Sequence, residues 1–259
     1  MSADESLPVL WQLRFSHFNE KGRWALDYKG LPHRRRSVAA GSHPIRSRRL
    51  GGTGTLPILV IDGEVIGDST DIIATLEQRR PDPPLYPDNE IDREAALELE
   101  EHFDSGLGPG LRSAVFHAIL PFRKVTVPVT TQGLPAQHRV ISTAIYPLIR
   151  VGATRSLGAD DEGARRGREQ TVEALDRIET ELNGRDYLVG DRFSVADLTA
   201  AALLFPLVCP PEFPYEMPAP WPDEWEEFRR SLAGRPGYQW AEEMYRRHRG
   251  SSAAVGEEG

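Results

Sequence analysis

Alternating apolar and polar positions at the start of the chain predict a first strand over residues 9–15, which runs into a polar corner at 16–19. Apolar residues then recur at helical spacing over 21–30. This helix is expected to stop at its last residue, a glycine, because a proline follows at Pro32 and glycine then proline is a common C-terminal signal.

A hairpin that leads into a helix is the clearest pattern in the first third of the chain. Residues 56–71 contain a short β-branched strand, a glycine turn, a second strand and the pair Asp68-Ser69, which opens a helix through 71–79. Pro57 cannot donate to a sheet, so it is placed at the start of the first of these strands. With a strand over 33–38 and a long loop or short helix over 39–54, the order is βαβ followed by ββα, a thioredoxin-like arrangement.

Segment 81–88 carries four prolines in eight positions and is predicted to link two domains. The predicted domains are a thioredoxin-like one over 6–88 and an all-helical bundle over 89–249. The small, acidic tail 250–259 is predicted to be disordered.

Helical periodicity dominates the second domain. A helix that starts near Ile91 is expected to kink at the glycine-rich run 106–110 and to resume over 111–120. A Ser194/Asp197 capping box is expected to start a buried helix that continues through 199–207. The remaining expectations are a loop over 121–136, a helix over 140–151 kinked at Pro147, a helix over 172–182, an extended loop over 209–222, and closing helices over 225–232 and 238–247.

Composition narrows the classes of function. The net charge of −8 argues against a nucleic-acid partner, whose phosphates demand positive charge. The chain has no apolar run long enough to span a membrane and no signal-peptide pattern, so a cytoplasmic, non-membrane protein is expected. Cys209 is the only cysteine, which excludes disulfides within the chain and thiolate metal clusters, and we predict no metal site.

The pair Leu56-Pro57, followed eleven positions later by Asp68-Ser69, resembles the glutathione site of the cytosolic glutathione transferases. In that family a cis-proline loop pairs with the cysteinyl backbone of glutathione, and an acid-serine pair at a helix start holds its γ-glutamyl end. The resemblance therefore implies the glutathione transferase fold, with glutathione as co-substrate. Asp68 and Ser69 are also ordinary helix-capping residues, so capping alone would explain their presence.

Two neighbouring residues compete for activation of the glutathione thiol at the end of the first strand. Read with Ser16 as the donor, the corner is similar to the serine and cysteine classes of the family; read with His17, it is similar to the tyrosine classes. Ser16 is favoured because a hydroxyl there matches a known class, while His17 stays open because an imidazole N–H also donates. Asn19 is a possible second donor, and a polar turn that merely starts a helix is the alternative for all three.

The resemblance also implies a basic residue near the glycyl carboxylate of glutathione. His43 lies fourteen positions before Pro57, a spacing similar to that of the family, and Arg46 follows closely. The family's usual sequence before the cis-proline is replaced by Gly-Gly-Thr-Gly-Thr at 51–55, and Asp68 stands where glutamate is usual. Both departures predict weaker glutathione binding.

We therefore expect a homodimeric glutathione transferase that attacks a small hydrophobic electrophile, with a role in detoxification. The electrophile is expected between the domains, against apolar residues that could equally belong to the core: Leu107, Leu111, Val115 and Phe116. The alternatives are a catalytically silent interaction module, and a glutathione-dependent isomerase, lyase or dehalogenase on the same fold. Cys209 is interpreted as a packing residue.

Overall fold

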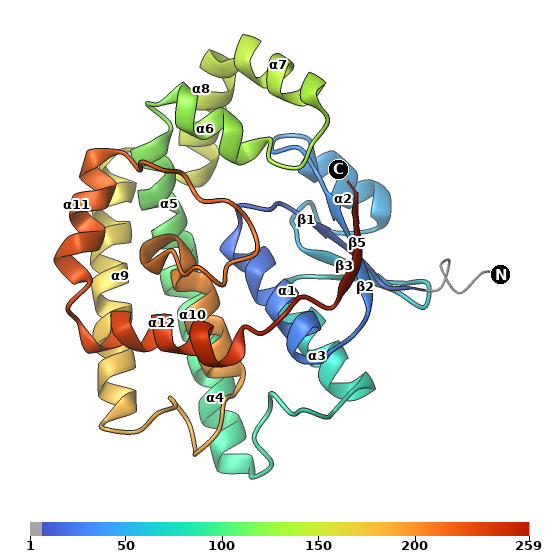
Figure 1. The fold of residues 1–259 in the computed structure, drawn as a ribbon, viewed down its shortest axis with the longest axis vertical. Helices are drawn as coiled ribbons and strands as arrows, with labels where there is room; N and C mark the ends of the chain where they lie inside the picture. The colour runs from blue at the N-terminus through green and yellow to red at the C-terminus, as the bar shows by residue number, and fades with distance from the viewer. Residues whose placement is uncertain (1–6, 259) are drawn as a thin grey trace.

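The computed structural model describes residues 7–258 and shows a mixed sheet beside a large helical domain (Figure 1). The first part of the chain alternates strands and helices, as the periodicity predicts. Its elements are β1 (Val9–Gln12), α1 (His17–Tyr28), β2 (His33–Ser37), α2 (His43–Leu50), β3 (Ile58–Ile61), β4 (Glu64–Gly67) and α3 (Ser69–Arg79).

The second part is helical and begins after the proline-rich segment 81–88. Its elements are α4 (Glu90–His102), the π-helical segment η2 (Phe103–Leu107), α5 (Gly108–Ile119), α6 (Arg123–Thr130), α7 (Ala136–Ala144), α8 (Tyr146–Leu157), α9 (Asp161–Leu182), α10 (Val195–Val208), α11 (Asp223–Leu232) and α12 (Pro236–His248). The thioredoxin-like and helical-bundle fold class is thus confirmed. The expected kink at 106–110 takes the form of the π-helical turn η2, after which Gly108 and Pro109 open α5.

The sheet contains a fifth strand, β5 (Ala254–Glu258), which the sequence did not predict. The strand order is β4-β3-β1-β2-β5; β2 is parallel to both of its neighbours, and β3 is antiparallel to β1 and β4. The prediction of disorder over 250–259 was therefore wrong, apart from Gly259, which lies outside the described residues. The edge of β2 that does not face β1 supplies the backbone hydrogen-bonding partners of β5. Just before β5, the Ala253 N–H donates to Asp27 Oδ1 at 2.8 Å.

Two further predictions in the helical domain were wrong. Segment 121–136 is not a loop, since α6 fills half of it even though Pro128 lies inside that helix. Segment 140–151 is not one kinked helix, since α7 and α8 meet at Ile145. Pro147 stands in the first turn of α8, where a backbone N–H has no intrahelical partner and a proline costs nothing.

Helix α10 is the centre of the helical domain and is buried along its whole length. The expected capping box is present: the Asp197 carboxylate accepts from the Ser194 N–H at 2.9 Å and from the Leu188 N–H at 2.8 Å. Burial raises the pKa of Asp197 to about 6, against these hydrogen bonds to its charged form. The box fixes where α10 begins, and α10 in turn packs against α1 of the first domain.

A buried polar cluster joins the two domains. The Lys21 ammonium on α1 lies 2.7 Å from Glu100 Oε1 on α4, donates to Thr70 Oγ1 on α3 at 2.8 Å, and bonds to Asp104 in η2. Lys21 is fully buried, so its charge depends on these partners. The Lys21 side chain thus connects α1 of the first domain to α4 and η2 at the start of the helical domain.

Candidate active site

Ser16 caps the N-terminus of α1 at the end of the first strand. Its Oγ accepts hydrogen bonds from the Asn19 side-chain amide at 2.7 Å and from the Asn19 backbone N–H at 3.4 Å. In both bonds the serine oxygen is the acceptor, so neither uses the hydroxyl hydrogen. The hydroxyl is half-buried at a helix N-terminus, a position that favours a negatively charged ligand.

Asn19 connects this corner to the hairpin. Its Oδ1 accepts from the Leu13 N–H at 2.9 Å, and its amide nitrogen donates to the Leu56 carbonyl at 3.1 Å as well as to Ser16. The side chain is fully buried. Sequence reasoning named Asn19 as a possible thiolate donor, but in the structure both amide hydrogens are engaged in positioning Ser16 and Leu56.

The Leu56-Pro57 peptide bond is cis, as the resemblance implies. Both residues are buried, and Pro57 lies against Gly22 of α1, where an added Cβ would stand 3.4 Å from the proline ring. Asn19 takes up one acceptor position of the Leu56 carbonyl, which has two. The hairpin thus presents the main chain of Leu56 beside the Ser16 corner.

Asp68 and Ser69 stand at the start of α3, immediately after the hairpin. Asp68 is the N-cap residue, with its Oδ1 accepting from the Thr70 N–H at 2.9 Å, and its side chain is exposed. It adopts a φ of 75°, which a non-glycine residue rarely does. Ser69 is the first residue of the helix and is 2 % exposed. The capping role is real, and the exposed carboxylate can also face a cationic group of a ligand.

His43 and Arg46 lie on a different element, the short helix α2. His43 Nδ1 accepts from the Gly41 N–H at 3.3 Å, and burial lowers the pKa of His43 below its usual value. The Arg46 guanidinium lies over the ring of Trp11 on β1, 5.0 Å from its centroid. These two residues are therefore held on a helix beside the sheet, and do not share the hydrogen bonds that join Ser16, Asn19 and Leu56.

His17 points into the molecule. Its side chain is 4 % exposed, its ring packs edge-on against Phe18 at 4.7 Å, and its Nε2 is buried without a hydrogen-bond partner. Burial, and then the charge of Arg112, lower the pKa of His17 to about 3, so the imidazole is neutral at physiological pH. Of the two residues considered as donors, His17 is thus buried and neutral, whereas Ser16 is half-buried.

The apolar residues expected to hold an electrophile mostly belong to the core. Leu107, Leu111 and Val115 are at most 2 % exposed. The half-buried Phe116 is one of three aromatic residues that surround Phe15 at the end of the first strand. Ring centroids lie 6.4 Å from Phe15 for Phe116, 5.9 Å for Phe205 and 6.1 Å for Trp221. Aromatic side chains therefore occupy the space next to the corner.

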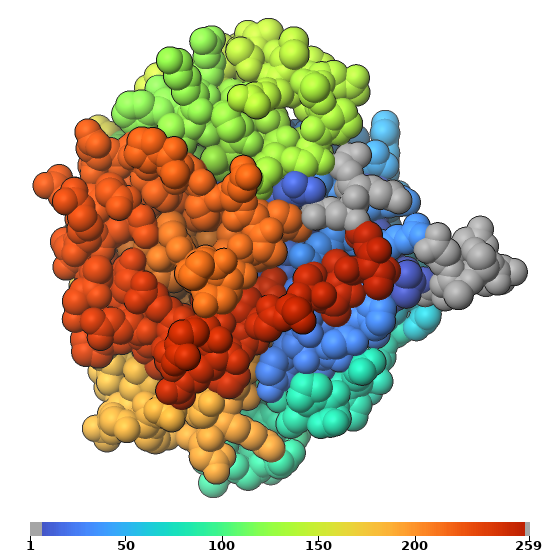
Figure 2. All heavy atoms as spheres, in the orientation of Figure 1, coloured from blue at the N-terminus to red at the C-terminus, as the bar shows by residue number. Residues whose placement is uncertain are grey.

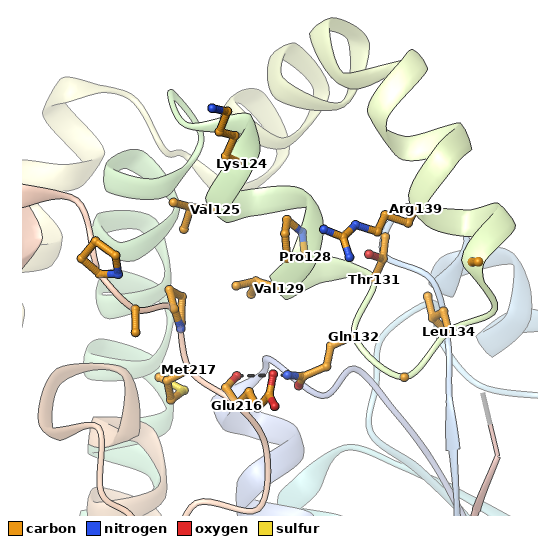
Figure 3. Close-up of a pocket in the computed structure, with 15 residues that line it drawn as sticks. Lys124, Val125, Pro128, Val129, Thr131, Gln132, Leu134, Arg139, Glu216 and Met217 are labelled. Atoms are coloured by element: carbon orange, nitrogen blue, oxygen red, sulfur yellow. Dashed lines mark hydrogen bonds between the residues drawn. The ribbon is translucent and has the colours of Figure 1, made fainter.

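A groove of about 700 Å³ opens nearby, between α6–α7 and the proline-rich loop 209–222 (Figure 3). Its lining is mainly apolar, with Val125, Val129 and Met217 facing it. The loop is anchored on the first domain because Gln12 donates to the Tyr215 hydroxyl at 2.6 Å. Sequence reasoning missed this groove, although the six prolines of 209–222 indicate a loop that holds an extended shape.

Two features are absent from residues 7–258, the part of the chain that the structure describes. No group of three or more histidine, cysteine, aspartate or glutamate side chains there is arranged to hold a metal ion. No helix of that part of the chain is long and apolar enough to cross a membrane.

Two curated proteins are similar to parts of this chain. A probable maleylacetoacetate isomerase from Caenorhabditis elegans is 32% identical over 104 residues, which cover 39% of this chain and 49% of that protein, so the match spans about half the length of that relative. The FtsZ-localized protein A of Caulobacter vibrioides is 28% identical over 186 residues, 70% of this chain and 69% of that protein.

Solved structures share the fold. FzlA from C. crescentus superposes with a TM-score of 0.58 at 24% identity, covering 91% of each chain. A glutathione S-transferase of Ceriporiopsis subvermispora, in complex with glutathione, superposes with a TM-score of 0.62 at 16% identity, covering 95% of this chain and 98% of that one. Identities this low show a common fold and no more.

Models of a single family match both parts of the chain. The N-terminal domain of glutathione S-transferase matches residues 10–84, and its C-terminal domain matches 142–227. Together these two ranges cover more than half of the sequence. The chain therefore belongs to the glutathione S-transferase superfamily.

Proposed function

We propose that the protein binds glutathione and activates its thiol for attack on a small hydrophobic electrophile, with Ser16 as the thiolate donor. The observation that carries this proposal is the hydrogen bonding of Ser16. Its oxygen accepts both bonds from Asn19, so its O–H can turn to a sulfur without breaking either of them. The sulfur would lie in front of the N-terminus of α1.

One hydroxyl and one helix N-terminus stabilise a thiolate enough to lower the pKa of the glutathione thiol. Lowering a thiol pKa from ~8.5 by two units requires a preference for the thiolate of about 2.7 kcal/mol. A hydrogen bond to a charged group contributes about 1.5–3 kcal/mol, and a helix N-terminus adds about 0.3–1 kcal/mol. One hydroxyl at the first turn of α1 is therefore enough.

The other parts of glutathione would contact the hairpin and the start of α3. The cysteinyl backbone would pair with Leu56 next to the cis-proline, and the γ-glutamyl end would meet Asp68 and Ser69 at the start of α3. His43 and Arg46 are the candidates for the glycyl carboxylate. The proposal includes a homodimer and a cytoplasmic location, which the family and the composition favour.

The test is to measure the pKa of the thiol of bound glutathione in Ser16→Ala and in His17→Phe. The absorbance of the thiolate is recorded as a function of pH. We expect Ser16→Ala to raise this pKa by about one to two units, because about 1.5–3 kcal/mol of thiolate stabilisation is lost. His17→Phe is the matched control at the next position and should leave it unchanged. An unchanged pKa in Ser16→Ala would show that another group holds the thiolate.

A second candidate function is a catalytically silent interaction module. Two observations favour it: the similarity to FtsZ-localized protein A, and the aromatic side chains around Phe15 where an electrophile was expected. Retention on immobilised glutathione, combined with conjugation of glutathione to a generic aromatic electrophile, separates the two. Flow-through without turnover at millimolar glutathione favours the interaction module.

A further inference from the structure

Helices α6, α7 and α8, together with the residues that join them, lie at one end of the molecule, seen in green in Figure 2. We name residues 121–159 the α6–α8 lobe. Its surface is unusually apolar. Of the eleven large hydrophobic side chains that are exposed within residues 7–258, six lie in this lobe. They are Phe122, Val140, Ile141, Ile145, Leu148 and Val151.

Helix α7 has apolar residues but no buried residue at all. Val140 is 69% exposed and Ile141 55%, and the exposure continues into α8, where Leu148 reaches 74%. An amphipathic helix normally buries its apolar face, and contiguous exposed apolar surface usually marks a binding site. Tyr146 is the one buried residue of α8, and its hydroxyl donates to the Leu120 carbonyl at 2.5 Å.

The lobe is also positively charged in an acidic protein. The chain has a net charge of −8, yet it contains neither aspartate nor glutamate between Asp104 and Asp160. The lobe carries five basic residues, all of them exposed: Arg123, Lys124, Arg139, Arg150 and Arg155. Exposed apolar and cationic side chains thus occur together along α7 and α8.

The groove described above is the inner border of the lobe. Lys124 and Arg139 line it from the lobe, and Figure 3 shows the Arg139 side chain reaching toward Pro128. The facing wall is the loop 216–220, whose Glu216 carboxylate is the acidic group of the lining. Its volume, about 700 Å³, is that of a site for a short peptide segment or a small molecule.

We propose that the α6–α8 lobe is the docking surface for an acidic, amphipathic segment of a partner protein. Apolar side chains of the segment would cover Val140, Ile141 and Leu148, and its carboxylates would pair with the surrounding arginines. Val140, Ile141 and Leu148 take no part in the hydrogen bonds that join Ser16, Asn19 and Leu56, so the proposal holds whether or not the chain is an enzyme.

Charge and composition favour a protein partner over an anionic membrane. Outside the lobe the chain is strongly acidic, which would repel a negatively charged lipid surface. The one tyrosine of the lobe is buried, and Phe122 is its only exposed aromatic residue, so the lobe lacks the aromatic belt of a membrane interface.

The test is a selection from random peptides of about 15 residues, about four helical turns, displayed on phage against the wild-type chain. Peptides that also bind the double variant Arg139→Glu/Leu148→Glu are removed at each round. We expect enrichment of sequences with net negative charge and with apolar residues at helical spacing. An enriched peptide is then labelled with fluorescein, and its binding is followed by anisotropy.

Matched variants locate the binding. Leu148→Glu and Arg139→Glu should each weaken the enriched peptide at least tenfold. The controls Ile91→Glu, at an exposed apolar position on α4, and Arg80→Glu, at the end of α3, should change it less than twofold. All four positions are exposed, so the unfolding midpoints should stay the same.

Four outcomes would overturn the proposal. The first is that no peptide is enriched over the double variant, and the second is that basic peptides are enriched. The third is that the control variants lose as much peptide affinity as Leu148→Glu and Arg139→Glu. The fourth is that Leu148→Glu abolishes self-association of the chain or binding to vesicles containing phosphatidylserine while leaving peptide binding intact. A second copy or a lipid surface would then be the occupant.

Discussion

At the scale of single residues, Ser16 and His17 differ sharply in burial, since Ser16 is half-buried and His17 is only 4 % exposed. Both have plausible chemistry, and they are adjacent at the start of α1. Only the rotation of the helix decides which one faces solvent, and that rotation is set by residues such as Trp24, which is fully buried against the second domain. The rotation that buries His17 is a product of tertiary packing, which the residues of the corner alone do not specify.

The burial of His17 predicts a pH-dependent stability. The pKa of His17 falls from 6.5 to about 3 on folding, so below pH 6.5 the unfolded chain takes up a proton that the folded chain refuses. Stability should therefore fall as the pH drops, by about 2 kcal/mol at pH 5 from this residue. His17→Phe should lose that share of the pH dependence, measured by urea unfolding at pH 7 and pH 5.

The remaining histidines serve as an internal control for this measurement. Burial also lowers the pKa values of His33, His43 and His248, and their contributions are the same in the wild type and in the variant. Identical pH dependence in the two proteins would show that His17 is hydrated or paired in the folded state.

At the scale of elements, the C-terminal strand depends on a buried ionic network. Arg249 Nε donates to Glu20 Oε1 at 2.6 Å and its Nη1 donates to Asp27 Oδ2 at 2.8 Å, both on α1. The other Asp27 oxygen accepts from Ala253, just before β5. The guanidiniums of Arg35 and Arg249 hold the pKa of Asp27 below its ordinary value, although its burial acts to raise it.

Arg249→Met should destabilise the protein by about 3–5 kcal/mol, because Glu20 and Asp27 would keep buried charges with fewer partners. The matched control is Arg247→Met, two residues earlier, whose ion pair with Glu243 lies at the surface, so its loss should change the stability little. Urea unfolding measures both. Equal, small losses would mean that the other arginines already compensate the two carboxylates.

Elements with strong periodicity or defined turn chemistry were predictable, and those held by distant contacts were not. The hairpin and α10 have local signals: a glycine turn, a capping box and a continuous apolar run. Strand β5 has none, since its small and acidic residues pair only because β2 offers an edge. The bounds of helix α7 were misjudged, since it begins at Ala136, at the end of the segment predicted to be a loop, and ends before Pro147.

At the scale of the whole molecule, Lys21 couples the two domains. It is fully buried between Glu100 and Asp104, and Thr70 links all three. Burial raises the pKa of Glu100 against the opposing effect of Lys21. This ammonium group therefore adds a buried ionic contact to the packing of α1 against the helical domain.

Lys21→Met should remove about 3–5 kcal/mol of stability at pH 7, since two carboxylates lose their cation. The loss should shrink as the pH falls toward 5, because a folded-state carboxyl with a raised pKa takes up its proton before the unfolded one does. Urea unfolding followed by both tryptophan fluorescence and circular dichroism tests this. A loss that grows at low pH would contradict it.

The pairing of β2 with β5 has a consequence for synthesis. Strand β2 is synthesised more than two hundred residues before β5, the strand that pairs with its edge. While the helical domain is still being synthesised, this edge of the sheet is therefore unpaired. Three consecutive arginines, Arg34, Arg35 and Arg36, stand on that edge, and charges at such positions discourage pairing with the wrong chain. These three arginines would thus reduce aggregation through the edge of β2 during translation.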